Sequence, residues 1–151
     1  RGDSSTQYNP RAKSGRAMEL IALYSVAATL GAMVFFAVGI APTVFQALPA
    51  DEAGRFLRRL FPRYYLALII GSGLAGLLWM TSQPIASGVC LLIAFSTLWV
   101  RQRLVPRINS LRDAELAGDA SAGLGFARLH RLSVAINMIQ LLALVVLLAR
   151  Y

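Results

Sequence analysis

The sequence predicts an all-α integral membrane protein, a four-helix bundle with short amphipathic helices in its two long connections. Apolar residues make up 57% of the 151 residues, charged residues only 15%, and the mean hydropathy is +0.60. A soluble domain typically has about 25% charged residues. Apolar stretches alternate with arginine-rich ones, and with one cysteine and one histidine the chain has neither a disulfide framework nor the usual ligands for zinc.

The first apolar stretch predicts the first membrane span. Residues 1–17 are polar and are expected to form a flexible tail, which leaves 18–151 as the four-span domain. Leu20 to Leu48 carries no charged residue and exceeds the roughly 20 residues needed to cross a bilayer. We expect a span over 20–41, with Pro42 bending or ending the helix.

The next stretch predicts an amphipathic helix followed by a helical hairpin. Asp51 and Glu52 favour a helix start, and apolar residues then recur at helical spacing among arginines up to Arg63. A second span is expected over 64–80 and a third over 85–100. The turn between them is short, so these two spans should be antiparallel neighbours.

The C-terminal third predicts another amphipathic segment and the fourth span. Arginines end the third apolar stretch, Pro106 to Leu116 is amphipathic, and Ala120 to Gly125 is rich in small residues. The fourth span is expected over 129–149.

The arginines predict the orientation and the first partner of the protein. The two long connections hold ten Lys and Arg residues, and the tail, short turn and C-terminus hold five. The positive-inside rule therefore places both long connections of this multi-pass protein in the cytoplasm and both termini outside. Basic side chains in the connections are expected to meet anionic lipid head groups rather than nucleic acid: Arg55, Arg58, Arg59, Arg63, Arg101, Arg103 and Arg107.

A polar stripe on the fourth span is the main candidate site. His130, Ser133, Asn137 and Gln140 fall within an arc of about 80° at roughly 100° per residue. We expect this stripe to face the bundle interior, toward the small-residue faces of the first two spans. It either joins helices by hydrogen bonds or lines a pocket or path, and the sequence leaves both readings open.

Small residues mark the predicted helix contacts. Five glycines lie in the first two spans, where they would let another helix approach closely: Gly31, Gly39, Gly71, Gly73 and Gly76. Another membrane protein or a second copy of the chain is therefore an expected partner.

The spans contain no recognisable catalytic set of residues and one candidate metal ligand. The spans contain no carboxylate pair and no Ser/His/Asp set, so no catalytic residue is predicted. No cofactor is predicted from this pattern. His130 is a weak candidate for a haem or copper ligand, since one axial histidine, alone or with a methionine, can hold haem iron.

Two pairs of segments carry a resemblance to a known family. Phe36 to Phe45 with Phe61 to Tyr65, and Leu104 to Asp113 with Phe126 to Asn137, resemble the DUF4149 family, also called TMEM205-like. The resemblance covers roughly residues 30–147 and implies a four-span protein of the bacterial inner membrane, of unsettled function. It also implies a distant relation to CopD-type copper proteins and to a haem-pathway membrane oxidase, which carry more histidines.

These observations leave two classes of function. The first is a non-enzymatic accessory subunit or small binding or transport module. The second is a haem- or copper-binding membrane redox protein that uses His130. The absorption spectrum of the purified protein separates them, because haem produces a Soret band.

Overall fold

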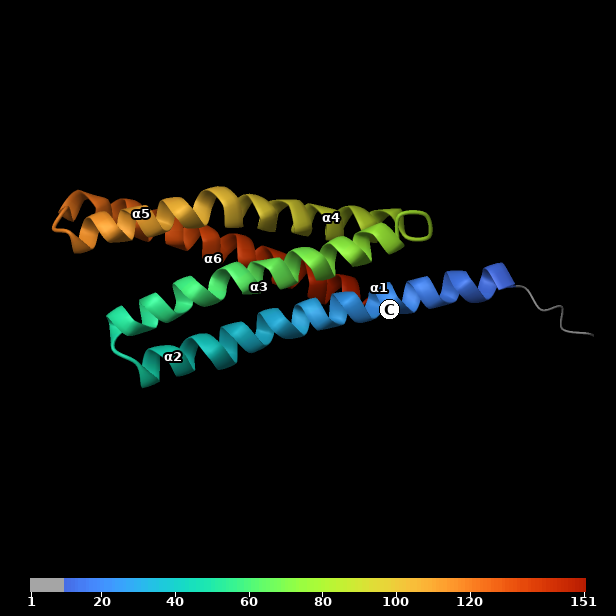
Figure 1. Ribbon diagram of the computed structural model, residues 1–151. Helices are drawn as coiled ribbons and strands as arrows, with labels where there is room; N and C mark the ends of the chain where they lie inside the picture. Colours follow the sequence, from blue (N-terminus) through green and yellow to red (C-terminus); the bar gives the residue numbers. More distant parts are fainter. Residues whose placement is uncertain (1–9) are drawn as a thin grey trace, which may run out of the picture.

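The structure, a computed structural model, describes residues 10–151, all of them in helices and short connections (Figure 1). Of the predicted polar tail, residues 1–9 lie outside the described part, and residues 10–17 form the first turns of α1. The elements in chain order are α1 (Pro10–Val34), η1 (Phe35–Ile40), α2 (Ala41–Ala47), α3 (Ala50–Leu78), α4 (Pro84–Trp99), η2 (Val100–Leu104), α5 (Val105–Leu116) and α6 (Ala120–Leu148).

Four continuous helices are long and apolar enough to cross a membrane, which confirms the predicted fold class. They run over Lys13–Ala47, Ala50–Leu78, Pro84–Leu116 and Ala120–Leu148. The first has 35 residues and would be about 52 Å long at roughly 1.5 Å per residue, against a hydrocarbon core of about 30 Å. The helices therefore extend well beyond the bilayer.

This extension changes how the two long connections are built. The predicted amphipathic segments are helical, but they continue the spans instead of forming separate short helices. Residues 50–63 are the first half of α3, and Val105–Leu116 follows α4 through η2 without a break. The small residues after Asp119 begin α6, because its carboxylate accepts a 2.9 Å hydrogen bond from the Ser121 amide and caps the helix.

Two π-helical turns explain why the prolines do not end the helices. η1 ends two residues before Pro42, and η2 ends two residues before Pro106. Proline lacks an amide proton, and its ring clashes with the carbonyl one turn earlier. The wider π-turn makes room for the ring, so the helix continues past it. Pro62 lies inside α3 at the level of these turns, as a hydrogen bond of 3.3 Å from Arg101 of η2 to its carbonyl shows.

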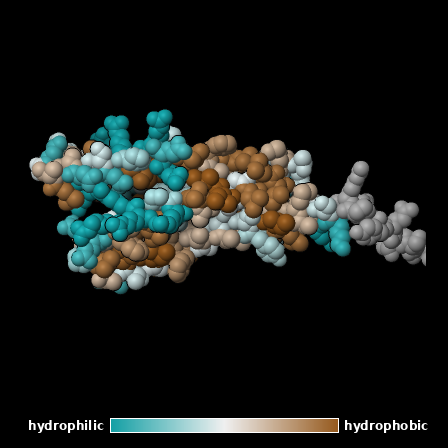
Figure 2. All heavy atoms as spheres, in the orientation of Figure 1, coloured by the Kyte–Doolittle hydropathy of each residue, from teal (hydrophilic) through white to brown (hydrophobic). Residues whose placement is uncertain are grey.

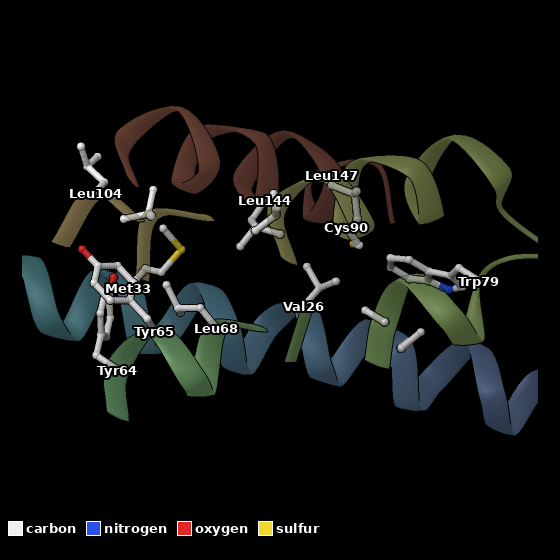
Figure 3. Close-up of a cluster of buried hydrophobic side chains, with 14 of the residues drawn as sticks. Val26, Met33, Tyr64, Tyr65, Leu68, Trp79, Cys90, Leu104, Leu144 and Leu147 are labelled. Atoms are coloured by element: carbon white, nitrogen blue, oxygen red, sulfur yellow. The ribbon is translucent and has the colours of Figure 1, made fainter. Parts of the chain in front are cut away.

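Neighbouring helices in the bundle run antiparallel (Figure 1). α3 packs against α1 and α4, and α6 packs against α1 and α5. The main core runs along the bundle axis, and Figure 3 shows it from Tyr64 and Tyr65 at one end to Trp79 at the other. A second, smaller core, made by Val44, Ala53 and Leu57, joins α2 to the start of α3.

The two ends of the bundle differ in polarity. We call the end that carries the α2–α3 and α5–α6 connections the polar end, and the end with the α3–α4 turn the hairpin end. Hydrophilic residues gather at the polar end and the middle of the molecule is apolar (Figure 2). Both long basic connections therefore lie at the same end.

Candidate functional site

A cleft near the polar end is the candidate functional site. Its volume is about 290 Å³, and all four long helices contribute to its walls. It lies at the level of η1 and α2, which follow α1, and of the part of α6 that is beside the start of the second span. The lining residues are Phe36, Ala37, Ala41, Phe45, Leu57, Phe61, Tyr64, Tyr65, Val105, Ile108, Asn109, His130, Ser133, Val134, Asn137 and Met138.

The cleft opens sideways between α2 and α6. Phe45 is 61% exposed, Val134 46% and Met138 38%, although all three line the cleft. α1 packs against α6, whereas α2 packs against α3 and η1. The helices on the two sides of the opening are thus held by different neighbours, and the opening is bordered by apolar side chains.

Aromatic rings form the inner wall of the cleft. Phe36 stacks on Tyr64 with ring centroids 4.4 Å apart, and Phe61 stacks on Tyr65 at 5.7 Å. Tyr64 and Tyr65 are almost fully buried. Tyrosines at the start of a span usually lie at the lipid–water interface, whereas these two pack inside the bundle. Their spacing after Leu57 and Phe61, which repeats one face of a helix, was the signal for a shared wall.

Three of the four residues of the polar stripe lie at the cleft. Ser133 is buried and donates a 2.7 Å hydrogen bond to the His130 carbonyl. The Tyr64 hydroxyl donates to Asn137 Oδ1 at 3.3 Å and so ties α3 to α6. The His130 ring is exposed on the wall and stacks on Phe126, with centroids 5.7 Å apart.

Gln140 faces a different helix from the one expected. Its amide nitrogen donates to Ser96 Oγ at 2.9 Å and to Thr97 Oγ1 at 3.1 Å, both on α4. The sequence interpretation directed the stripe toward the first two spans. Gln140 instead fastens the fourth span to the third, outside the cleft, and is buried there.

The five small-residue positions divide by their surroundings. A Cβ at position 71 would overlap Thr29 Oγ1 of α1, and one at position 76 would lie 2.7 Å from Leu91 Cγ of α4. At Gly73 the nearest atom would be at an ordinary contact distance, 3.9 Å. A Cβ at Gly39 would meet only Phe35 of its own turn, and one at Gly31 would meet nothing within 4 Å.

Two arginines at the polar end hold helices together. Arg58 of α3 forms a 2.7 Å ion pair with Asp113 of α5 and donates to the Asn109 carbonyl at 3.4 Å. The hydrogen bond from Arg58 lowers the pKa of the Asp113 carboxyl below its ordinary value of 3.8. Arg101 donates to the Pro62 carbonyl, again from the third helix to the second. The other predicted surface arginines are exposed: Arg55, Arg59, Arg63, Arg103 and Arg107.

Two residues of the cleft lining could ligate a metal, His130 and Met138, which lie eight residues apart on α6. Among the described residues, no three His, Cys, Asp or Glu side chains lie close enough to hold a metal. Binding of haem or copper through His130 alone stays a prediction.

Comparison with known proteins adds the family. Neither a curated protein nor a solved structure matches the chain. One family model, described as a domain of unknown function, matches residues 24–116. The matched segment runs from α1 to the end of α5, so it includes three walls of the cleft and ends before α6. Because the match covers well over half of the chain, the protein belongs to the DUF4149 family.

Proposed function

We propose that the protein is a small membrane-embedded binding module whose cleft takes up a lipid-soluble molecule from the bilayer. The observation that carries this proposal is the sideways opening bordered by Phe45, Val134 and Met138. An opening on the flank of a helical bundle faces the bilayer, where an apolar border is compatible with lipid. The route into the cleft then leads from the membrane rather than from water.

The size and lining of the cleft support a small apolar guest with one polar end. Binding sites for small molecules usually have volumes of about 300–1,000 Å³, apolar walls and a few polar groups that fix orientation. The 290 Å³ cleft lies at the lower end of that range, with aromatic walls and Asn137, His130 and Asn109 as polar groups. It therefore suits a ring or part of a chain, with the remainder extending into the bilayer.

The environment of the protein is part of the same proposal. We place it in a bacterial inner membrane with the polar end in the cytoplasm, supported by the excess of arginine in the two long connections. The exposed arginines then meet anionic head groups. Service as an accessory subunit, alone or as several copies, fits the same shape, because much of the apolar flank is exposed.

Photolabelling in membranes tests the proposal. The probe is a long-chain fatty alcohol with a diazirine on the chain, added to vesicles that contain the full-length protein. Labelled peptides should map to Phe36–Phe45 and to the α6 segment 130–138. Ala37→Trp places a large side chain in the cleft and should reduce this labelling at least fivefold.

The neighbouring position supplies the matched control. Val38 is 71% exposed and does not line the cleft, so Val38→Trp should leave the labelling of 130–138 unchanged. Val134→Trp blocks the opening from the other side and tests the result if Ala37→Trp folds poorly. Labelling spread evenly along all lipid-facing helices, unchanged by either blocking variant, would overturn the proposal.

A further inference from the structure

We infer that the molecule held in the cleft has an uncharged polar end with hydrogen-bond-accepting oxygens on a flat ring, the chemistry of a quinone or another ring ketone. This inference rests on the proposed function and identifies the class of ligand for the same cleft. It follows from three properties of the lining: its lack of fixed charge, its free hydrogen-bond donors and its paired aromatic rings.

The first property is charge. None of the described residues that line the cleft is Asp, Glu, Lys or Arg. The two nearby arginines that point between helices already have partners. Arg58 pairs with Asp113 and donates to the Asn109 carbonyl, and Arg101 donates to the Pro62 carbonyl. A carboxylate or phosphate in the cleft would lose much of its water without gaining an arginine or lysine as a partner, at a high cost.

The second property is the direction of the hydrogen bonds. The Ser133 hydroxyl proton is used on the His130 carbonyl, and the Tyr64 hydroxyl proton is used on Asn137 Oδ1. The Asn137 carbonyl thus uses one of its two lone pairs, whereas its amide nitrogen keeps two N–H groups without a partner among the described residues. The edge of the cleft thus offers donors and favours a ligand with acceptor oxygens.

The third property is shape. Two stacked ring pairs, Phe36 with Tyr64 and Phe61 with Tyr65, give the inner wall flat faces. Aromatic side chains prefer offset or edge contacts with another ring, and these contacts add to the burial of apolar area. A substituted six-membered ring with two carbonyls fits within the 290 Å³ of the cleft, and its acceptor oxygens lie in the ring plane.

Competition against the diazirine alcohol tests this inference on the full-length protein in vesicles. The competitors are duroquinone, durene and laurate. Durene is the matched control for duroquinone because it has the same methylated ring without the two carbonyls. We expect duroquinone to displace the probe at roughly three- to tenfold lower membrane concentration than durene, the effect of one hydrogen bond. Laurate, an anion, should compete more weakly than either.

Two variants separate ligand contact from helix packing. Asn137→Leu removes the free amide donors and should abolish the advantage of duroquinone over durene. Tyr64→Phe breaks the same Tyr64–Asn137 hydrogen bond but keeps the Asn137 amide, so the advantage should persist. A purely structural role for Asn137 would make the two variants behave alike.

Each other result has a definite meaning. Equal displacement by duroquinone and durene would overturn the inference on the polar end and leave the binding function standing. Stronger displacement by laurate would overturn the uncharged class. Absence of any cleft labelling by the probe itself would overturn the proposed function, and this inference with it.

Discussion

The hairpin end and the cleft show two ways of bringing the same four helices together. Near the hairpin end, Gly71 and Gly76 let α1 and α4 approach α3 so closely that a Cβ would collide, and the Ser87 hydroxyl donates to the Gly76 carbonyl at 2.7 Å. At the cleft, π-turns and prolines widen the helices, and large rings replace small residues. Small residues leave no space for a guest, whereas the interrupted helices leave 290 Å³.

This difference teaches where a membrane bundle can host a ligand. Lipid gives helices no hydrophobic reason to associate, so close packing must hold them somewhere. Once the hairpin end supplies that packing, the cleft level can carry aromatic rings and donors that hold the helices less tightly. The predictions below separate the two regions, from the largest expected effect to the smallest.

Gly76→Ala should cause the largest loss of stability. Its Cβ would lie 2.7 Å from Leu91 Cγ and 3.2 Å from the Leu91 backbone nitrogen, so α3 and α4 must move apart. Overpacking of this kind typically costs about 1–3 kcal/mol. Thermal unfolding in detergent measures the loss. Gly88→Ala on the same hairpin is the control, because nothing lies within 4 Å of its Cβ. Equal behaviour of the two variants would contradict the close packing.

Gln140→Leu should weaken the bundle more than Asn137→Leu. Gln140 is buried and makes two hydrogen bonds to α4, whereas Asn137 accepts one, from Tyr64, at 3.3 Å. Such bonds between helices in a membrane average about 0.6 kcal/mol, with a maximum near 1.7. The measurement is resistance to unfolding in a series of SDS concentrations. A larger effect at Asn137 would mean that the cleft, not the α4–α6 contact, holds the fourth span.

Pro42→Ala should stabilise the protein slightly while narrowing the cleft. Alanine restores the amide proton and removes the ring that η1 accommodates. Because the π-turn has already relieved the clash, and because proline restricts the unfolded chain more than alanine does, the net gain should stay below about 1 kcal/mol. Photolabelling of 130–138 should fall. Pro84→Ala is the control, since Pro84 occupies the first turn of α4, where proline is tolerated. Unchanged labelling would separate the π-turn from the cleft.

Asp113→Asn should have the smallest effect, and only its pH dependence is informative. The folded-state pKa of Asp113 is lowered from 3.8, chiefly by the hydrogen bond from Arg58. Its contribution to stability is therefore present above about pH 3.8 and is lost as the pH falls through the folded-state pKa. Because the carboxyl is exposed, the melting temperature at pH 7 should change by little more than the error of measurement. A large loss at pH 7 would mean that this ion pair holds α5 in place.

The four spans could be predicted because long apolar stretches are typical of helices that cross a membrane. The helix ends were harder to predict. Pro42 and Pro106 are read as breakers by any local rule, and the π-turns that let the helices continue depend on the packing around them. The stripe on the fourth span was visible from its spacing, although nothing local showed that Gln140 would leave the group for α4.

The cleft itself could not be predicted, because it has no sequence pattern of its own. It arises where α1 packs on α6 but α2 packs on α3, which is a property of helix paths. Tyr64 illustrates the difficulty. Tyrosine at the start of a span usually marks the lipid–water interface. Its burial against Phe36 and its hydrogen bond to Asn137 became clear only with the partner helices in place.

The alignment of the helix interruptions has a mechanical consequence. Three helix interruptions lie at one height along the bundle: η1 with Pro42, Pro62, and η2 with Pro106. Arg101 of η2 donates to the Pro62 carbonyl, and the ring centroids of Phe36 and Phe61 are 5.3 Å apart. A four-helix bundle in which three helices are interrupted at one height should bend most easily at that height. Lateral pressure from the bilayer, or a pull on the polar end, would therefore act on the width of the cleft before it disturbed the tightly packed hairpin end.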